Sequence, residues 1–164
     1  MNPIQTYFQA EKEESIFFIL FGIFFLSLGI YLFFQTNSFS KFFSLPSVAI
    51  SLIQIVVGTT VFFRTDKQMD DLKSKLESSR QIVYSEELPR MQKVMSNFKL
   101  YKAIEISFIF LSLIGFVYSY FNSDPRILGF CSGLLIQSSL MIIADVIAEE
   151  RGKLYLDYIY SLTN

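Results

Sequence analysis

Four apolar stretches recur along the chain, and each is about as long as a helix that crosses a bilayer. They cover residues 15–34, 46–63, 106–122 and 127–144, and none contains a Lys, Arg, Asp or Glu. A spanning helix needs roughly 17–25 residues, because the apolar layer of a membrane is about 30 Å thick. The pattern predicts an all-α membrane protein with four transmembrane helices, arranged as two hairpins.

Residues 64–102 join the second and third stretches and have the pattern of an amphipathic helical hairpin. Apolar residues recur at helical spacing on both sides of the motif YSEELPR, with charged residues between them. Ser85 is a good helix cap and Pro89 is tolerated in a first turn, so we expect the second arm to begin there. Spans two and three would then extend into the cytoplasm as one hairpin, either structural or a docking surface for a partner. The chain, 1–164, is interpreted as one membrane domain.

The two membrane hairpins also resemble each other in sequence. The motif LSLG at residues 26–29 recurs as LSLIG at 111–115, and the motif LIQ ends at both Gln54 and Gln137. These matches favour a parallel repeat, with the hairpins related by an axis along the membrane normal. Matches this short also arise by chance in sequence rich in Leu and Phe.

The basic residues predict the orientation. Of the 14 Lys and Arg residues, all but Lys41 and Arg126 fall at the termini or between residues 64 and 102. Segments rich in Lys and Arg stay on the cytoplasmic side of a membrane. Both termini and the central segment are therefore expected in the cytoplasm, and the N-terminal apolar stretch is interpreted as a retained anchor.

The composition removes several classes of function. The chain has no His, which is the commonest general base and metal ligand, and its single Cys131 excludes an intramolecular disulfide. A formal net charge of −1 gives no reason to expect nucleic acid as a partner. We expect no enzymatic activity and no cofactor or metal. The expected partners are the lipid bilayer and another protein or further copies of this chain.

Polar side chains inside the apolar stretches are candidates for helix packing. Gln54 and Gln137 lie near the middle of spans two and four, where an amide should face protein rather than lipid. They either bond each other and nearby hydroxyls or line a polar permeation path. Gly129 and Gly133 form a GxxxG pattern, which allows close approach of span three or of span four from another copy.

Charged residues at the cytoplasmic ends of the spans form a second candidate site. Asp145 lies six residues before Arg151, Glu105 three residues after Lys102, and Arg64 at the end of span two. We expect Glu105 and Asp145 to face the bundle and to share Arg64 or Arg151, since a lone charge in a membrane is costly. The cluster could fix helix depth, respond to protons or ions, or bind another protein.

Several segments together resemble a group of bacterial proteins. They are FFRTDKQ (62–68), EELPRMQKVMSNFKLYKAIE (86–105), Gln137 and DVIAEERGKLY (145–155). The pattern resembles small bacterial inner-membrane proteins with four spans, most of them uncharacterised, some of which are immunity partners of secreted toxins. The resemblance implies a bacterial cytoplasmic membrane and supplies no catalytic residue.

Three functions fit these observations. The first is a non-enzymatic membrane protein that acts by protein–protein binding, such as a toxin-immunity protein or an accessory subunit. The second is a small oligomeric channel or transporter, with Gln54, Gln137, Glu105 and Asp145 along a path. The third is an enzyme that acts on lipid, although no spacing here matches a known mechanism.

Overall fold

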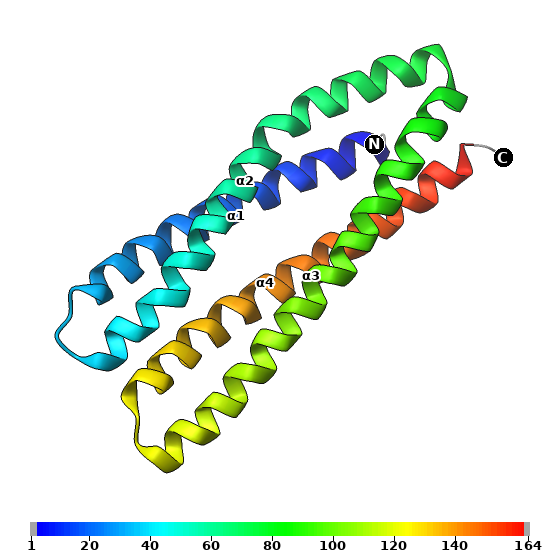
Figure 1. Ribbon diagram of the computed structural model, residues 1–164. Helices are drawn as coiled ribbons and strands as arrows, with labels where there is room; N and C mark the ends of the chain where they lie inside the picture. Colours follow the sequence, from blue (N-terminus) through cyan, green and yellow to red (C-terminus); the bar gives the residue numbers. More distant parts are fainter. Residues whose placement is uncertain (1–2, 163–164) are drawn as a thin grey trace.

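Four long helices make up the structure, a computed structural model that describes residues 3–162 apart from the side chain of Glu77. They are α1 (Pro3–Phe33), α2 (Ser38–Ser78), α3 (Arg80–Asn122) and α4 (Pro125–Ser161) (Figure 1). No strand occurs within residues 3–162. The all-α prediction is confirmed. The predicted domain also includes residues 1, 2, 163 and 164, which lie outside the described range.

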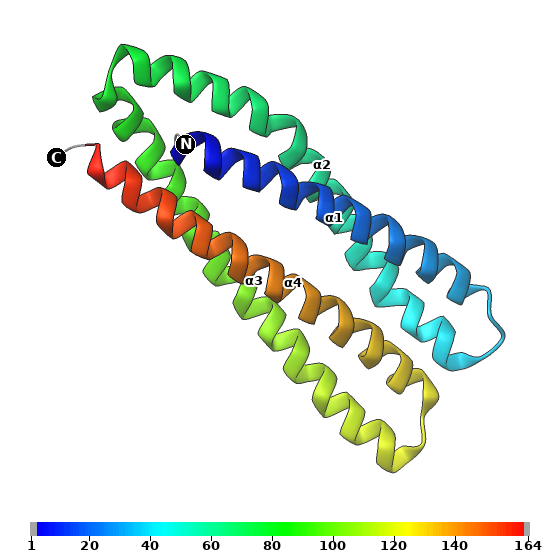
Figure 2. The ribbon, with the colours of Figure 1, turned by 180° about the vertical axis from the view of Figure 1, so that it is seen from behind.

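The helices form two antiparallel hairpins, α1–α2 and α3–α4, joined where α2 and α4 lie side by side (Figures 1 and 2). Helix α1 flanks α2, and α3 flanks α4. Both hairpin loops lie at one end of the bundle, here called the loop end. Both termini and the α2–α3 turn lie at the other, here called the terminal end. This placement puts the basic-rich segments at one end.

At the loop end, polar side chains cap the first turns of α2 and α4. The Asn37 side chain accepts a hydrogen bond from the Ser40 backbone N–H at 2.7 Å, and Asp124 accepts one from Arg126 at 2.9 Å. These side chains satisfy amide groups that the first turn of a helix leaves unpaired. Ser123 adopts a left-handed conformation, with φ of 51°, and reverses the chain between α3 and α4. Both hairpins therefore close with few residues outside a helix.

The central segment turns at Ser79 rather than near Ser85. Ser79 is extended, with φ of −165° and ψ of 123°, and it separates α2 from α3. Pro89 lies inside α3, where it cannot donate the usual backbone hydrogen bond. Residues before Pro89 stay helical because Val83 and Glu87, 1% and 3% exposed, pack into the terminal end. The predicted start of the second arm was wrong by about one and a half turns.

Between the two ends, small polar side chains face inward and large apolar ones face outward. Ser44, Ser47 and Ser51 of α2 are at most 1% exposed, whereas Phe17 and Phe110 are 61% and 65% exposed. The three serine hydroxyls donate to backbone carbonyls of their own helix. Each helix contains a stretch long and apolar enough to cross a membrane. The exposed apolar surface suits lipid as its surroundings.

The terminal end contains the main buried apolar cluster that the described residues form. It draws on all four helices: Ile4, Tyr7 and Phe8 of α1, Leu72 of α2, Val83 and Met91 of α3, Tyr155 and Ile159 of α4. The Tyr7 and Tyr155 rings stack 4.2 Å apart. Tyr-rich ends are typical of headgroup anchors, but Tyr155 is only 3% exposed. The terminal segments therefore pack against the central hairpin.

Candidate functional site

Gln54 and Gln137 join the two hairpins at the centre of the bundle. The Gln54 Nε2 group donates to Gln137 Oε1 at 3.2 Å, and the two residues are 4% and 0% exposed. Gln54 Oε1 and Gln137 Nε2 are buried and have no partner among the described residues. The contact links α2 to α4 and leaves one donor group and one acceptor unsatisfied.

Gly129 and Gly133 lie where α4 approaches the backbone of α2. A Cβ atom added at Gly129 would lie 2.2 Å from the Phe39 carbonyl oxygen, and one at Gly133 would lie 2.6 Å from that of Phe43. The sequence suggested span three or another copy as the partner of these glycines. Their partner here is α2 of the same chain, because this face of α4 packs on the neighbouring hairpin.

Glu105 and Asp145 face each other across α3 and α4. Their carboxyl groups interact electrostatically with each other, and the residues are 5% and 8% exposed. Both Glu105 oxygens and Asp145 Oδ2 lack a hydrogen-bond partner among the described residues. Two ionised carboxylates have no hydrogen to share, so this arrangement requires a proton to become a hydrogen bond.

Arg64 and Arg151 pair with acidic residues of α1, not with Glu105 or Asp145 as expected. Arg64 Nη2 lies 3.3 Å from Glu11 Oε1, and Arg151 forms an ion pair with Glu14. Glu11 and Glu14 lie just before span one in the sequence, and the packing of α1 places them at the same depth as the two arginines.

Two further ion pairs, which share the Glu149 carboxylate, lie next to the carboxyl pair, toward the terminal end. Lys102 bonds Glu149, and Lys153 approaches the same carboxylate at 3.3 Å. Lys102 is thus the cation that acts on Glu105, but its ammonium group is bound to Glu149. Lys102 and Glu105 lie one turn apart in the sequence. Glu149 competes with Glu105 for Lys102 only because α4 packs on α3, which the sequence does not show.

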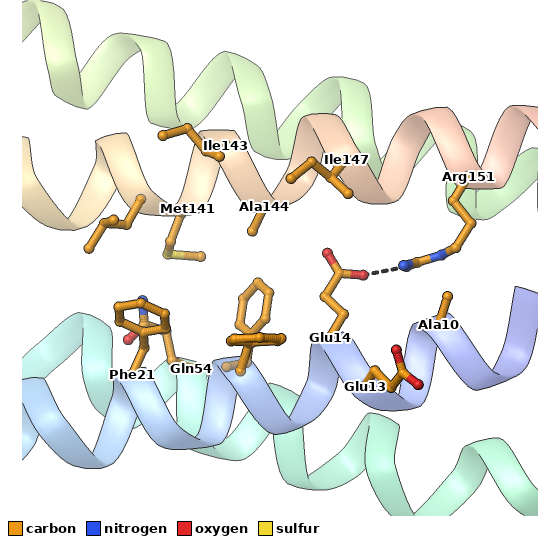
Figure 3. A pocket seen from close by; sticks show the side chains of 13 residues that line it. Ala10, Glu13, Glu14, Phe21, Gln54, Met141, Ile143, Ala144, Ile147 and Arg151 are labelled. Carbon is orange, nitrogen blue, oxygen red and sulfur yellow. Dashed lines mark hydrogen bonds and ion pairs between the residues drawn. The ribbon is translucent and has the colours of Figure 1, made fainter.

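A groove runs between α1 and α4 beside this region (Figure 3). Its volume is about 460 Å³, and its walls are mostly apolar, with Phe17 and Phe21 on one side and Ile143 and Ile147 on the other. Gln54 reaches it from α2, and the Glu14–Arg151 pair lies toward the terminal end of the groove. From Ala10 to Phe21 the wall is about 16 Å long, or three helical turns.

A second buried polar cluster, at the terminal end, was missed in the sequence. Glu87 is 3% exposed, pairs with Arg90 at 2.5 Å and accepts a hydrogen bond from the Tyr155 hydroxyl at 3.0 Å. Burial, together with the Glu87 carboxylate, raises the pKa of Tyr155. The i, i+3 spacing of Glu87 and Arg90 was a signal for their pairing, but nothing local pointed to Tyr155.

The described residues 3–162 contain no group of three or more His, Cys, Asp or Glu side chains that could hold a metal ion. The arrangement contains a mostly apolar groove, a buried amide pair and a buried carboxyl pair. Comparison of the chain with protein-family models, with curated proteins and with solved structures finds no match.

Proposed function

We propose that this is a non-enzymatic integral membrane protein that acts by binding another membrane protein, as a toxin-immunity protein or an accessory subunit does. The groove between α1 and α4 carries the proposal. It combines apolar walls, a buried amide and charged groups at one end, all on long helices. A site of this kind recognises another helix by shape and by a few polar contacts.

The proposed environment is a bacterial cytoplasmic membrane, with both termini and the α2–α3 turn in the cytoplasm. Two features support it. Large apolar side chains surround the middle of the bundle, and 12 of the 14 Lys and Arg residues belong to segments at or near the terminal end. A bias of this kind retains a segment on the cytoplasmic side. The residues 64–102 would then form the cytoplasmic extension of spans two and three, and the two hairpins a parallel repeat.

The occupant that best fits the groove is one transmembrane helix of a different protein, with Lys or Arg at its cytoplasmic end. Glu13 lines the charged end of the groove and forms no ion pair within the described residues, while Glu14 is neutralised by Arg151. The groove therefore has one unmatched negative charge. Transmembrane helices commonly carry basic residues at this depth, so the charges are complementary.

Site-specific photo-crosslinking in living cells tests this assignment. A photoreactive phenylalanine analogue replaces Phe17 in the groove, or Phe110 on the outer face of α3, which is similarly exposed. We expect a crosslink to one second membrane protein from position 17 and none from position 110. Ala144→Phe places a large side chain in the groove and should abolish the crosslink. Ala103→Phe, at an exposed position of α3, should not. Crosslinks only to lipid, or only to another copy of this chain, contradict the proposal.

The immunity version of the proposal has its own test. If a toxin gene lies beside this one, deletion of the chain should sensitise cells to that toxin, and the Ala144→Phe variant should fail to restore protection. Unchanged sensitivity would rule out the immunity role. The accessory-subunit role is then tested by the identity of the protein that crosslinks at position 17.

An oligomeric channel or transporter is a second candidate, favoured by the buried polar atoms along the bundle. Besides the amide and carboxyl pairs, the Ser112 and Ser138 hydroxyls are buried without a partner among the described residues. A chain of such groups can line a path, although four spans would need further copies to enclose one. Purified protein in liposomes that passes neither ions nor protons at any pH tested would rule this function out.

A further inference from the structure

The facing carboxyls of Glu105 and Asp145 differ from every other acidic group in this part of the bundle. Glu14 is held by Arg151, and Glu149 by Lys102 and Lys153. Among the described residues, no cation lies in hydrogen-bonding contact with Glu105 or Asp145, yet both are more than nine-tenths buried. An unpaired buried carboxylate is costly, so the site needs a positively charged ligand or loses its own charge.

The charges around the pair can be counted helix by helix. Glu14 of α1 faces Asp145, Lys102 of α3 approaches both carboxyls, and Glu149 of α4 lies one turn from Asp145. With Arg151 and Lys153, which bind these acids, the region has four carboxyls and three cations. One negative charge remains unmatched, and it belongs to the pair that has no cation of its own.

A single proton fits this site better than a metal ion does. A proton placed between the two carboxyls makes one a donor and the other an acceptor, and it satisfies atoms that now have no partner. Ca²⁺ takes about six to eight oxygen ligands and Mg²⁺ about six. The pair supplies two carboxyl groups, and the nearest other acids already hold Arg151 and Lys102.

We infer that Glu105 and Asp145 form a proton-binding site, in which the two carboxyls share one proton at neutral pH and hold α3 against α4. Loss of the proton would place two negative charges face to face in a dry contact between the helices. Packing of α3 on α4 would therefore weaken as the pH rises through the titration of the pair. This inference does not depend on what occupies the α1–α4 groove.

Infrared spectroscopy of the purified protein in detergent micelles tests the site directly. A protonated carboxyl has a C=O stretching band that an ionised carboxylate lacks. We expect this band to be present at neutral pH and to be lost in Glu105→Gln and in Asp145→Asn. Glu13→Gln, at an exposed carboxyl in the groove, should retain it. A wild-type band that forms only under acid conditions, near the ordinary pKa of about 4 for free carboxylic acids, would overturn the inference.

Thermal unfolding distinguishes a proton from a merely structural contact and from a metal ion. We expect the wild-type unfolding temperature to fall by roughly 2–4 °C between about pH 6 and pH 9, because the hydrogen bond made by the shared proton is lost over this range. Glu105→Gln supplies a permanent N–H donor to Asp145 and should remove most of this fall, whereas Glu13→Gln should not. A fall that is unchanged in Glu105→Gln would overturn the inference. Stabilisation by Na⁺ or Ca²⁺ at constant pH, absent with choline, would assign the site to a metal cation instead.

Discussion

At the scale of single residues, the Gln54–Gln137 hydrogen bond makes each amide depend on the other. Replacing Gln137 by Leu leaves Gln54 buried and unpaired, and we expect the free energy of unfolding to fall by about 1–2 kcal/mol. The double variant, with Leu at both positions, should recover most of that loss because no amide then remains. Unfolding in mixed micelles measures all three proteins, and a strictly additive double variant would show that the two amides do not interact.

Gly129 offers a second test at this scale. The Cβ of Gly129→Ala would collide with the rigid backbone of α2, so we expect a loss of about 1–3 kcal/mol in unfolding free energy. Gly152→Ala is the matched control in the same helix, because its Cβ would meet the flexible end of Met95 at 3.0 Å. It should cost much less, and equal losses in the two variants would show that α4 does not approach α2 as described.

At the scale of elements, the terminal end depends on contacts between segments far apart in the chain. Tyr155 of α4 stacks on Tyr7 of α1 and donates a hydrogen bond to Glu87 of α3. Tyr155→Phe keeps the stacking but removes a hydrogen bond to a buried carboxylate, which is worth about 1.5–3 kcal/mol. We expect faster amide hydrogen exchange in the first turns of α1 and α3. Exchange unchanged there, with full stability, would show that Glu87 does not need the hydroxyl.

The elements also show how far the sequence could predict the structure. The four uncharged stretches predicted the four helices, because a run of apolar residues of that length has few alternatives. The turn at Ser79 was missed because Pro89 is a strong local signal for a helix start. The residues before Pro89 stay helical because Val83 and Glu87 are buried, and that burial is a tertiary effect. The partners of Arg64 and Arg151 were missed for the same reason, because helix depth and rotation decide them.

At the scale of the whole molecule, the middle of the bundle and its terminal end have different interiors and surfaces. The middle has an interior of serine, glycine and amide groups under an apolar surface, while the terminal end has an apolar interior. The first pattern suits lipid as the surrounding medium, and the second suits water, where apolar burial is the main stabilising term. The boundary between the patterns lies near the Glu14–Arg151 and Lys102–Glu149 ion pairs, where charged side chains gather.

The same division predicts the topology that labelling in cells will find. In a Cys131→Ser background, a cysteine at Thr36 lies in the α1–α2 loop and one at Ser78 lies at the α2–α3 turn, both exposed. A membrane-impermeant maleimide should label Thr36→Cys in intact cells and should label Ser78→Cys only after permeabilisation, because the proposed orientation places the basic-rich end in the cytoplasm. The opposite pattern would reverse the orientation. Labelling of both sites in intact cells, or purification of the chain without detergent, would contradict the membrane assignment itself, on which the helical docking partner depends.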